Sequence, residues 1–243
     1  MKISVERLRR IRLVVSDMDG TLLSKKNELP EITRKLIDQL EQQAKVHFAL
    51  GTGRPRISAA HPFTDEFRFN TRPGIFLNGA QVHGTSGELV SQSVISGEAV
   101  QAVFDALTGH RPHRVSVTLC CGDKVHLLAS EDDHAFSNYL AAKYKDPFPT
   151  VLSGDEGVNV NMISVLCRDI QDVKSWLIPE LEKVAHFYGL ILVNSLPNLV
   201  SLLPPSTSKA EGVRVLAEKP EISMDEVAAI GTEMGTPIMI LKC

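Results

Sequence analysis

The sequence lacks the features that nucleic-acid-binding and membrane-spanning proteins share. Its 26 basic and 29 acidic side chains leave a formal net charge of −3, so no basic excess is available to neutralise a nucleic-acid backbone. The most apolar later stretch, Leu190–Leu203, is interrupted by Asn194, Pro197 and Asn198, which excludes a membrane span there. No apolar run follows the basic residues near the N-terminus, so we expect no secretory signal. These absences predict a protein without nucleic-acid or membrane partners.

Cysteine is scarce, and neither cysteine nor histidine shows the spacing of a metal site. The four cysteines are not arranged in metal-type pairs, and the eight histidines show no ligand pattern. Cys120 and Cys121 are neighbours on an expected strand and point to opposite faces. We therefore expect four reduced thiols in a cytoplasmic protein.

Apolar content of 43% and charged content of 23% are ordinary for a globular chain. The first third alternates short apolar runs with amphipathic helical patterns. The expected strands and helices, in chain order, are Ile11–Val15, Leu29–Gln43, Val46–Leu50, Pro55–Ala60 and Gly74–Leu77. In the first helix, Ile32, Leu36, Ile37 and Leu40 recur at helical spacing. This order of elements predicts an α/β fold with a parallel sheet and helices on its faces.

The pattern changes after Gln81 to a block rich in hairpins, and the first pattern resumes near Ser208 with an expected helix, Lys209–Ala217, and an expected strand, Glu226–Ile230. We therefore expect a discontinuous core domain of residues 1–81 and 204–243 and an inserted domain of residues 82–203. The inserted block is expected to contain helices at Glu98–Leu107, Asp132–Lys143 and Ile170–Phe187. Its expected strands are a pair within Val115–Ala129, on either side of Gly122-Asp123, and single strands at Asn161–Cys167, Leu190–Asn194 and Leu199–Leu203.

Two carboxylates follow the first apolar run at a spacing that indicates chemistry. Asp17 and Asp19 come directly after the strand and are followed by Gly20 and Thr21. Carboxylates at the end of a buried strand are costly unless a cation meets them, and that edge of an α/β sheet is where ligands bind. The pattern predicts a Mg²⁺-supported phosphoryl-transfer site in which Asp17 attacks phosphorus and Asp19 handles the proton. The alternative is a helix cap or turn pair.

The string DMDGTLL, residues 17–23, resembles the corresponding motif of the haloacid-dehalogenase-type phosphatases. The order of the later motifs is similar to that of the Cof-type branch, and the similarity covers nearly the whole chain. The resemblance implies a Rossmann-like parallel-sheet core with an inserted α+β cap domain.

The resemblance also implies a role for each matching residue. Asp17 is the nucleophile that forms an aspartyl-phosphate, and Asp19 is the general acid and then the general base. Mg²⁺ is held by Asp17 and by the backbone carbonyl of Asp19, while Lys209 offsets negative charge. The residues that correspond to the phosphate or substrate site are Thr21, Thr52, Gly53, Arg54, Asn78 and Gly79.

Three of these positions have simpler interpretations. Thr52 is also suited to cap the helix expected from Pro55. Asn78-Gly79 is also a common turn dipeptide. Lys209 taken alone is typical of a solvated helix residue.

The string from Gly231 departs from the family's fourth motif, whose acidic residues complete the Mg²⁺ shell. Thr232 stands where the first aspartate belongs, and Gly235-Thr236 stand where Asn-Asp belongs. Glu233 is a candidate third metal ligand, although its register differs by one. The codons of Pro237–Cys243 can be chosen so that a one-base shift of frame reads Asp-Asn-Asp-Ile-Glu-Met. We therefore expect a core domain shortened at its C-terminus and hypothesise a frameshifted gene end.

Two functional hypotheses follow. The first is a Mg²⁺-dependent phosphatase of a small phosphorylated metabolite, with a sugar phosphate as a candidate and the cap closing over Asp17. The second is a remnant of the fold that binds phosphate or a metabolite without turnover. A phosphomutase uses a similar intermediate, and no feature of the sequence favours it.

Overall fold

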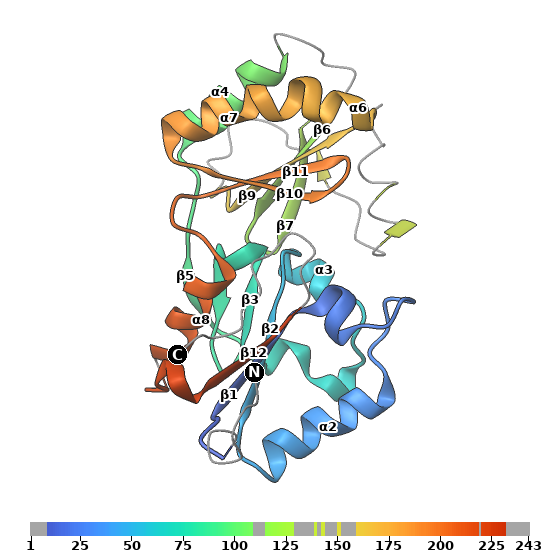
Figure 1. Cartoon of the computed structure of the whole chain (residues 1–243), viewed down its shortest axis with the longest axis vertical. Helices are drawn as coiled ribbons and strands as arrows, with labels where there is room; N and C mark the ends of the chain where they lie inside the picture. The colour runs from blue at the N-terminus through green and yellow to red at the C-terminus, as the bar shows by residue number, and fades with distance from the viewer. Residues whose placement is uncertain are drawn as a thin grey trace. The chain divides into compact units, whose positions relative to one another are not determined.

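The computed structural model describes residues 9–108, 115–128, 139, 142–143, 150–151, 159–218 and 220–231. It divides into two compact units (Figure 1). The first contains the chain up to Arg54, Ala59–Gln92 and the chain from Ser208 onward, and the second contains Pro55–Ser58 and Ser93–Thr207.

The first unit is built on a six-stranded sheet in the order β12-β1-β2-β3-β4-β5. Its parallel strands are β1 (Leu13–Ser16), β2 (His47–Gly51), β3 (Gly74–Phe76) and β12 (Val227–Ile230). Its helices are α2 (Glu31–Gln42), α3 (Arg56–Ala60), whose first residues fall in the second unit, and α8 (Lys209–Glu218). The predicted α/β class with a parallel sheet is confirmed.

Side chains alternate between the two faces of this sheet, and each face is covered. Leu13 and Val15 of β1 pack in one apolar cluster with Val213 and Leu216 of α8. Val14, between them, packs in a second cluster on the other side. Because β1 contributes apolar side chains to both clusters, its sequence is a continuous apolar run instead of an alternating one.

The second of these clusters receives α2 through Ile37 and, in part, Leu40. Ile32 and Leu36 share the helical spacing of Ile37 and Leu40, but they are 66% and 58% exposed. The side of α2 that contains Ile37 faces the sheet, and Ile32 and Leu36 lie outside that contact.

A hairpin extends the first sheet beyond β3. Strand β4 (Gln81–His83) pairs antiparallel with β3, and β5 (Leu89–Gln92) pairs antiparallel with β4. The expected boundary between residues 81 and 82 falls inside this hairpin, whereas the division by contacts falls after Gln92. The hairpin pattern was expected to mark the second domain, but hydrogen bonding to β3 keeps it in the first unit.

The second unit holds another six-stranded sheet, in the order β10-β11-β9-β6-β7-β8. Its strands are β6 (Val115–Cys121), β7 (Lys124–Leu128), β8 (Thr150–Val151), β9 (Met162–Cys167), β10 (Ile191–Leu196) and β11 (Leu199–Leu203). All neighbours are antiparallel except β7 and β8.

One face of this second sheet is covered by helices (Figure 1). They are α4 (Gly97–Thr108) and a continuous helical run made of α6 (Ile170–Asp172), η5 (Val173–Leu177) and α7 (Ile178–Tyr188). The helix expected at residues 132–143 lies outside the described residues except for Tyr139, Ala142 and Lys143, which are helical. Short helical turns complete the described chain, at η1 (Met18–Leu22), η2 (Asp65–Phe67), η3 (Phe69–Thr71), η4 (Leu77–Gly79) and η6 (Met224–Glu226).

Three of the four cysteines lie in the described chain, and all three are free thiols: Cys120, Cys121 and Cys167. Burial raises the pKa of the Cys121 thiol to about 11, which keeps it protonated and unreactive at neutral pH. Cys243 lies outside the described residues. Within the described chain, no helix combines the length and the apolar content that crossing a membrane would require.

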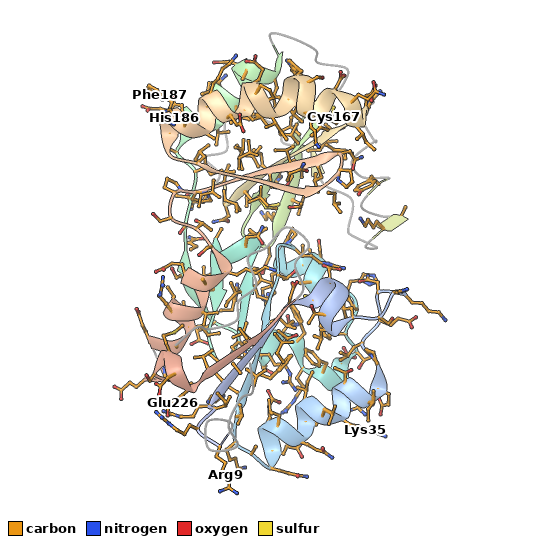
Figure 2. The ribbon with its side chains drawn as sticks, viewed as in Figure 1. Arg9, Lys35, Cys167, His186, Phe187 and Glu226 are labelled. Atoms are coloured by element: carbon orange, nitrogen blue, oxygen red, sulfur yellow. The ribbon has the colours of Figure 1, made fainter. Side chains whose placement is uncertain are left out.

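Helix α7 offers a matched test of its packing. Leu181 is fully buried against the second sheet, while Phe187, near the end of the same helix, is 79% exposed (Figure 2). We expect Leu181→Ala to destabilise the second unit by about 2–5 kcal/mol through lost burial and the cavity left behind. Phe187→Ala should cost less than about 1 kcal/mol. Urea denaturation of both variants measures the difference, and equal losses would contradict the packing described here.

Candidate active site

The predicted carboxylates lie where β1 ends. Strand β1 stops at Ser16, and the backbone N–H of Asp17 donates to the carbonyl of Ile230 at 2.9 Å. Asp17 then caps η1, because its Oδ1 accepts from the N–H of Met18 at 2.9 Å. Gly20 has a φ of +73°, a conformation that glycine adopts without steric cost, and the chain turns there. The helix-cap interpretation of Asp17 is therefore correct for one of its two oxygens.

Asp17 forms an ion pair with the first residue of α8. Nζ of Lys209 donates to Oδ1 of Asp17 at 2.9 Å, and the two side chains are 15% and 16% exposed. The interpretation of Lys209 as a solvated helix residue is therefore wrong. Oδ1 of Asp17 accepts both of these hydrogen bonds, and Oδ2 accepts none from the described residues. One oxygen is thus held in place while the other is available to a ligand.

Asp19 has a cation of its own. Arg54 donates from Nε to Oδ2 of Asp19 at 2.9 Å and from Nη2 to Oδ1 at 2.5 Å. This two-pronged geometry is the strong form of an arginine–carboxylate pair. The Arg54 side chain is 7% exposed and that of Asp19 is 47% exposed. Nη2 of Arg54 also donates to Oδ1 of Asn27 at 2.7 Å, a contact that the sequence analysis did not anticipate.

The loops after β2 and β3 are bonded to each other. The N–H of Asn78 donates to the carbonyl of Thr52 at 3.0 Å, and the N–H of Leu77 donates to the carbonyl of Arg54 at 3.1 Å. A Cβ placed on Gly53 would lie 3.0 Å from Oδ1 of Asn78, so any larger residue there would require the Asn78 amide to shift. Because β1, β2 and β3 are neighbours in one sheet, these loops open at the same edge as Asp17.

The Thr52 side chain is buried, and its Oγ1 accepts from the N–H of Arg54 at 3.1 Å. Helix α3 begins later, at Arg56, so Thr52 closes the turn before the helix instead of capping it.

The Asn78-Gly79 pair is more than a turn between strands. Leu77, Asn78 and Gly79 have φ values of +51°, +54° and +106°. Glycine adopts a positive φ without cost, but at Leu77 it is backbone strain of the kind that concentrates at functional sites. A Cβ on Gly79 would lie 2.2 Å from the carbonyl oxygen of Ser208. Gly79 therefore lets this loop pack against the residue that precedes Lys209.

The remaining predicted site residues are Thr21 and the residues that follow Gly231. Thr21 is in η1 and is partly buried. Gly231 lies beside Asp17, since a Cβ on Gly231 would be 3.6 Å from Cβ of Asp17. Thr232 and Glu233 lie outside the described residues, so the metal role of Glu233 stays a prediction.

The donor set suits a magnesium ion held by few protein ligands. The carboxylate of Asp17 and the backbone carbonyl of Asp19 are hard oxygen donors, and Mg²⁺ is commonly bound through one or two carboxylates together with waters and phosphate. Nowhere in the described residues do three or more histidine, cysteine or acidic side chains form a group that could hold a metal ion. The described residues therefore offer two oxygen donors that fit a magnesium ion, without a complete set of protein ligands.

Comparison with known proteins gives a consistent result. A family model described as haloacid dehalogenase-like hydrolase matches residues 14–235. A 5-amino-6-(5-phospho-D-ribitylamino)uracil phosphatase of Bacillus subtilis is 23% identical over 235 residues, which cover 95% of this chain and 80% of that protein. A chloroplastic endoribonuclease of Arabidopsis thaliana is 26% identical over 226 residues. That match covers 90% of this chain but only 38% of the plant protein.

The fold is also found among solved structures. A haloacid dehalogenase-like hydrolase from Bacteroides thetaiotaomicron superposes with a TM-score of 0.73 at 22% identity. The match covers 91% of this chain and 81% of that one. At this identity the likeness establishes the fold, an α/β core with a second α/β unit, in agreement with the fold predicted above.

The ion pair between Asp17 and Lys209 can be measured without assaying any activity. We expect Lys209→Met to leave a mostly buried carboxylate without its cation, and therefore to destabilise the first unit. Asp17→Asn in the same chain should recover part of the loss. A double-mutant cycle by urea denaturation should give a coupling energy of about 1–3 kcal/mol. Strictly additive effects would contradict the pair.

Proposed function

Since this chain belongs to the haloacid dehalogenase-like hydrolases, we propose that it is a Mg²⁺-dependent phosphatase of a small phosphorylated metabolite. The family expected from the string at residues 17–23 is confirmed. The proposal rests on one observation above the others. Lys209 and the N–H of Met18 hold Oδ1 of Asp17 and leave Oδ2 at the ligand-binding edge of the sheet.

In the proposed reaction, Oδ2 of Asp17 attacks phosphorus and the ester P–O bond breaks. The protonated form of Asp19 gives its proton to the departing oxygen and becomes the carboxylate that Arg54 holds. Asp19 then takes a proton from the water that attacks the aspartyl-phosphate, and inorganic phosphate leaves with Asp17 restored. Bound Mg²⁺ would supply positive charge to the phosphoryl oxygens and bring the phosphate to the carboxylate.

Fixed donors are proposed to hold the phosphoryl group. The hydroxyl of Thr52 and the side-chain amide of Asn78 are polar groups on adjoining loops at the same sheet edge, and Lys209 places a positive charge beside Asp17. A spreading negative charge is stabilised by such preorganised groups, because they need no reorganisation during the reaction. Thr21, Gly53, Arg54 and Gly79 keep their proposed places at this phosphate and substrate site.

Substrate choice is assigned to the second unit, which we propose as the cap. We propose Ser93–Thr207 as its extent in place of 82–203, because the division of the chain by contacts supports a boundary after Gln92. A small phosphorylated compound as substrate is supported by the name of the Bacillus subtilis relative, and a sugar phosphate stays a candidate. A cytoplasmic location also stays a prediction.

A second candidate function has an observation in its favour. Asp17 and Asp19 each form an ion pair with a basic side chain of the protein. In addition, Thr232 and Gly235-Thr236 stand where the family's fourth motif has acidic residues. A protein that binds phosphate or a metabolite without turnover would have this composition. Thr232→Asp separates the two candidates, because a gain of Mg²⁺-dependent turnover from an inactive parent would favour the remnant.

The central prediction concerns Asp17. We expect Mg²⁺-dependent hydrolysis of p-nitrophenyl phosphate by the full chain and a loss of at least about a thousandfold in kcat in Asp17→Asn, which has no nucleophilic carboxylate. The matched control is Asp105→Asn, the same chemical change at an exposed position on α4, and its activity should equal that of the parent. Turnover that survives Asp17→Asn, or that persists unchanged after chelation of Mg²⁺, would exclude the proposed mechanism.

A further inference from the structure

The loop that follows η1 turns one polar side chain inward. Leu22 and Leu23 are buried and anchor the start of this loop in the apolar cluster under α2. The N–H of Ser24 donates to the carbonyl of Glu28, and the N–H of Asn27 donates to the carbonyl of Ser24, both at 2.9 Å. Within residues 24–28 Asn27 alone is partly buried, and its four neighbours are exposed.

The inward side chain contacts the cation that holds Asp19. Oδ1 of Asn27 accepts from Nη2 of Arg54 at 2.7 Å, and the same Nη2 donates to Oδ1 of Asp19 at 2.5 Å. Nε of Arg54 makes the second bond to Asp19, at 2.9 Å. The three side chains therefore form a connected group in which Arg54 is the buried centre.

We infer that Asn27 is a positioning residue for proton transfer by Asp19, acting through Arg54. The inference rests on the proposed function, in which Asp19 protonates the leaving group. A guanidinium presents its donors in one rigid plane, so the Arg54–Asp19 pair moves as a unit unless a third contact stops it from pivoting. Asn27 supplies one such contact, from a loop anchored by buried leucines. Small misplacements of a reacting group cost large factors in rate.

A backbone requirement is the competing explanation for an asparagine at this position. Asn27 has a φ of +61°, a region that asparagine, aspartate and glycine occupy more readily than other residues. The backbone requirement and the side-chain contact can therefore be separated by substitution. Asn27→Gly keeps the turn and removes the side-chain oxygen, whereas Asn27→Asp keeps both the turn and an oxygen that can accept from Arg54.

The experiment compares two esters in the full chain with Mg²⁺. Hydrolysis of p-nitrophenyl phosphate needs little protonation of its leaving group, whereas an alkyl phosphate such as glycerol phosphate needs it. We expect Asn27→Gly to lower kcat/KM for the alkyl ester about tenfold and for the aryl ester less than about twofold. Asn27→Asp should restore most of the alkyl-ester activity. Lys25→Gly, at an exposed position of the same loop, should change neither value.

The test uses the ratio of kcat/KM for the alkyl ester to kcat/KM for the aryl ester. Because both values are measured on the same protein, the ratio does not depend on its yield or stability. An equal loss on both esters, or a loss that Asn27→Asp does not restore, would show that Asn27 only shapes the turn and would overturn the inference. If the parent hydrolyses neither ester, the proposed function fails first and the inference falls with it. If the parent is active and the ratio does not change in Asn27→Gly, the inference alone fails.

Discussion

The ion pair between Lys209 and Asp17 is the interaction on which this architecture depends. A carboxylate at the end of a buried strand is costly without a cation, and here the cation comes from a residue 192 positions further along the chain. The two ends of the first unit must therefore meet. Parallel pairing of β12 with β1 brings the later segment back, and the close approach of Gly79 to Ser208 sets where α8 begins.

The need to pair each carboxylate with a cation also applies to the rest of the site. Asp19, the second carboxylate, is met by Arg54, so two positive and two negative side chains lie together at one sheet edge. The pairing does not use every acceptor, because Oδ2 of Asp17 receives no hydrogen bond from the described residues. The charges of the two ion pairs cancel. A phosphate ester would add two negative charges to this edge, so its binding there would require further positive charge. This is the physical reason for expecting Mg²⁺ there.

The local sequence pattern predicts most strands and helices of the fold. It does not predict features that depend on contacts between residues far apart in the chain. The apolar runs at β1 and β2 predicted parallel strands because both faces of the sheet are covered. The local pattern places the hairpin β4–β5 with the inserted block, whereas its pairing with β3 is a tertiary event that no local signal carries. Ile32 and Leu36 fit the helical period and are nevertheless exposed. Lys209 was identified only through the order of motifs in a family, and Asn27 was missed because its contact with Arg54 depends on how one loop closes.

The discontinuity of the first unit has a consequence for how the protein is made. Strands β1, β2 and β3 leave the ribosome early, whereas α8 and β12 follow only after the whole stretch Ser93–Thr207 has been translated. The nascent sheet therefore waits with one edge of β1 unpaired and with Asp17 lacking its counter-charge, while the later unit is free to fold as it emerges. Completion of this edge of the sheet is accordingly a late docking of the segment that holds α8 and β12, and chaperone protection should be needed most in that interval.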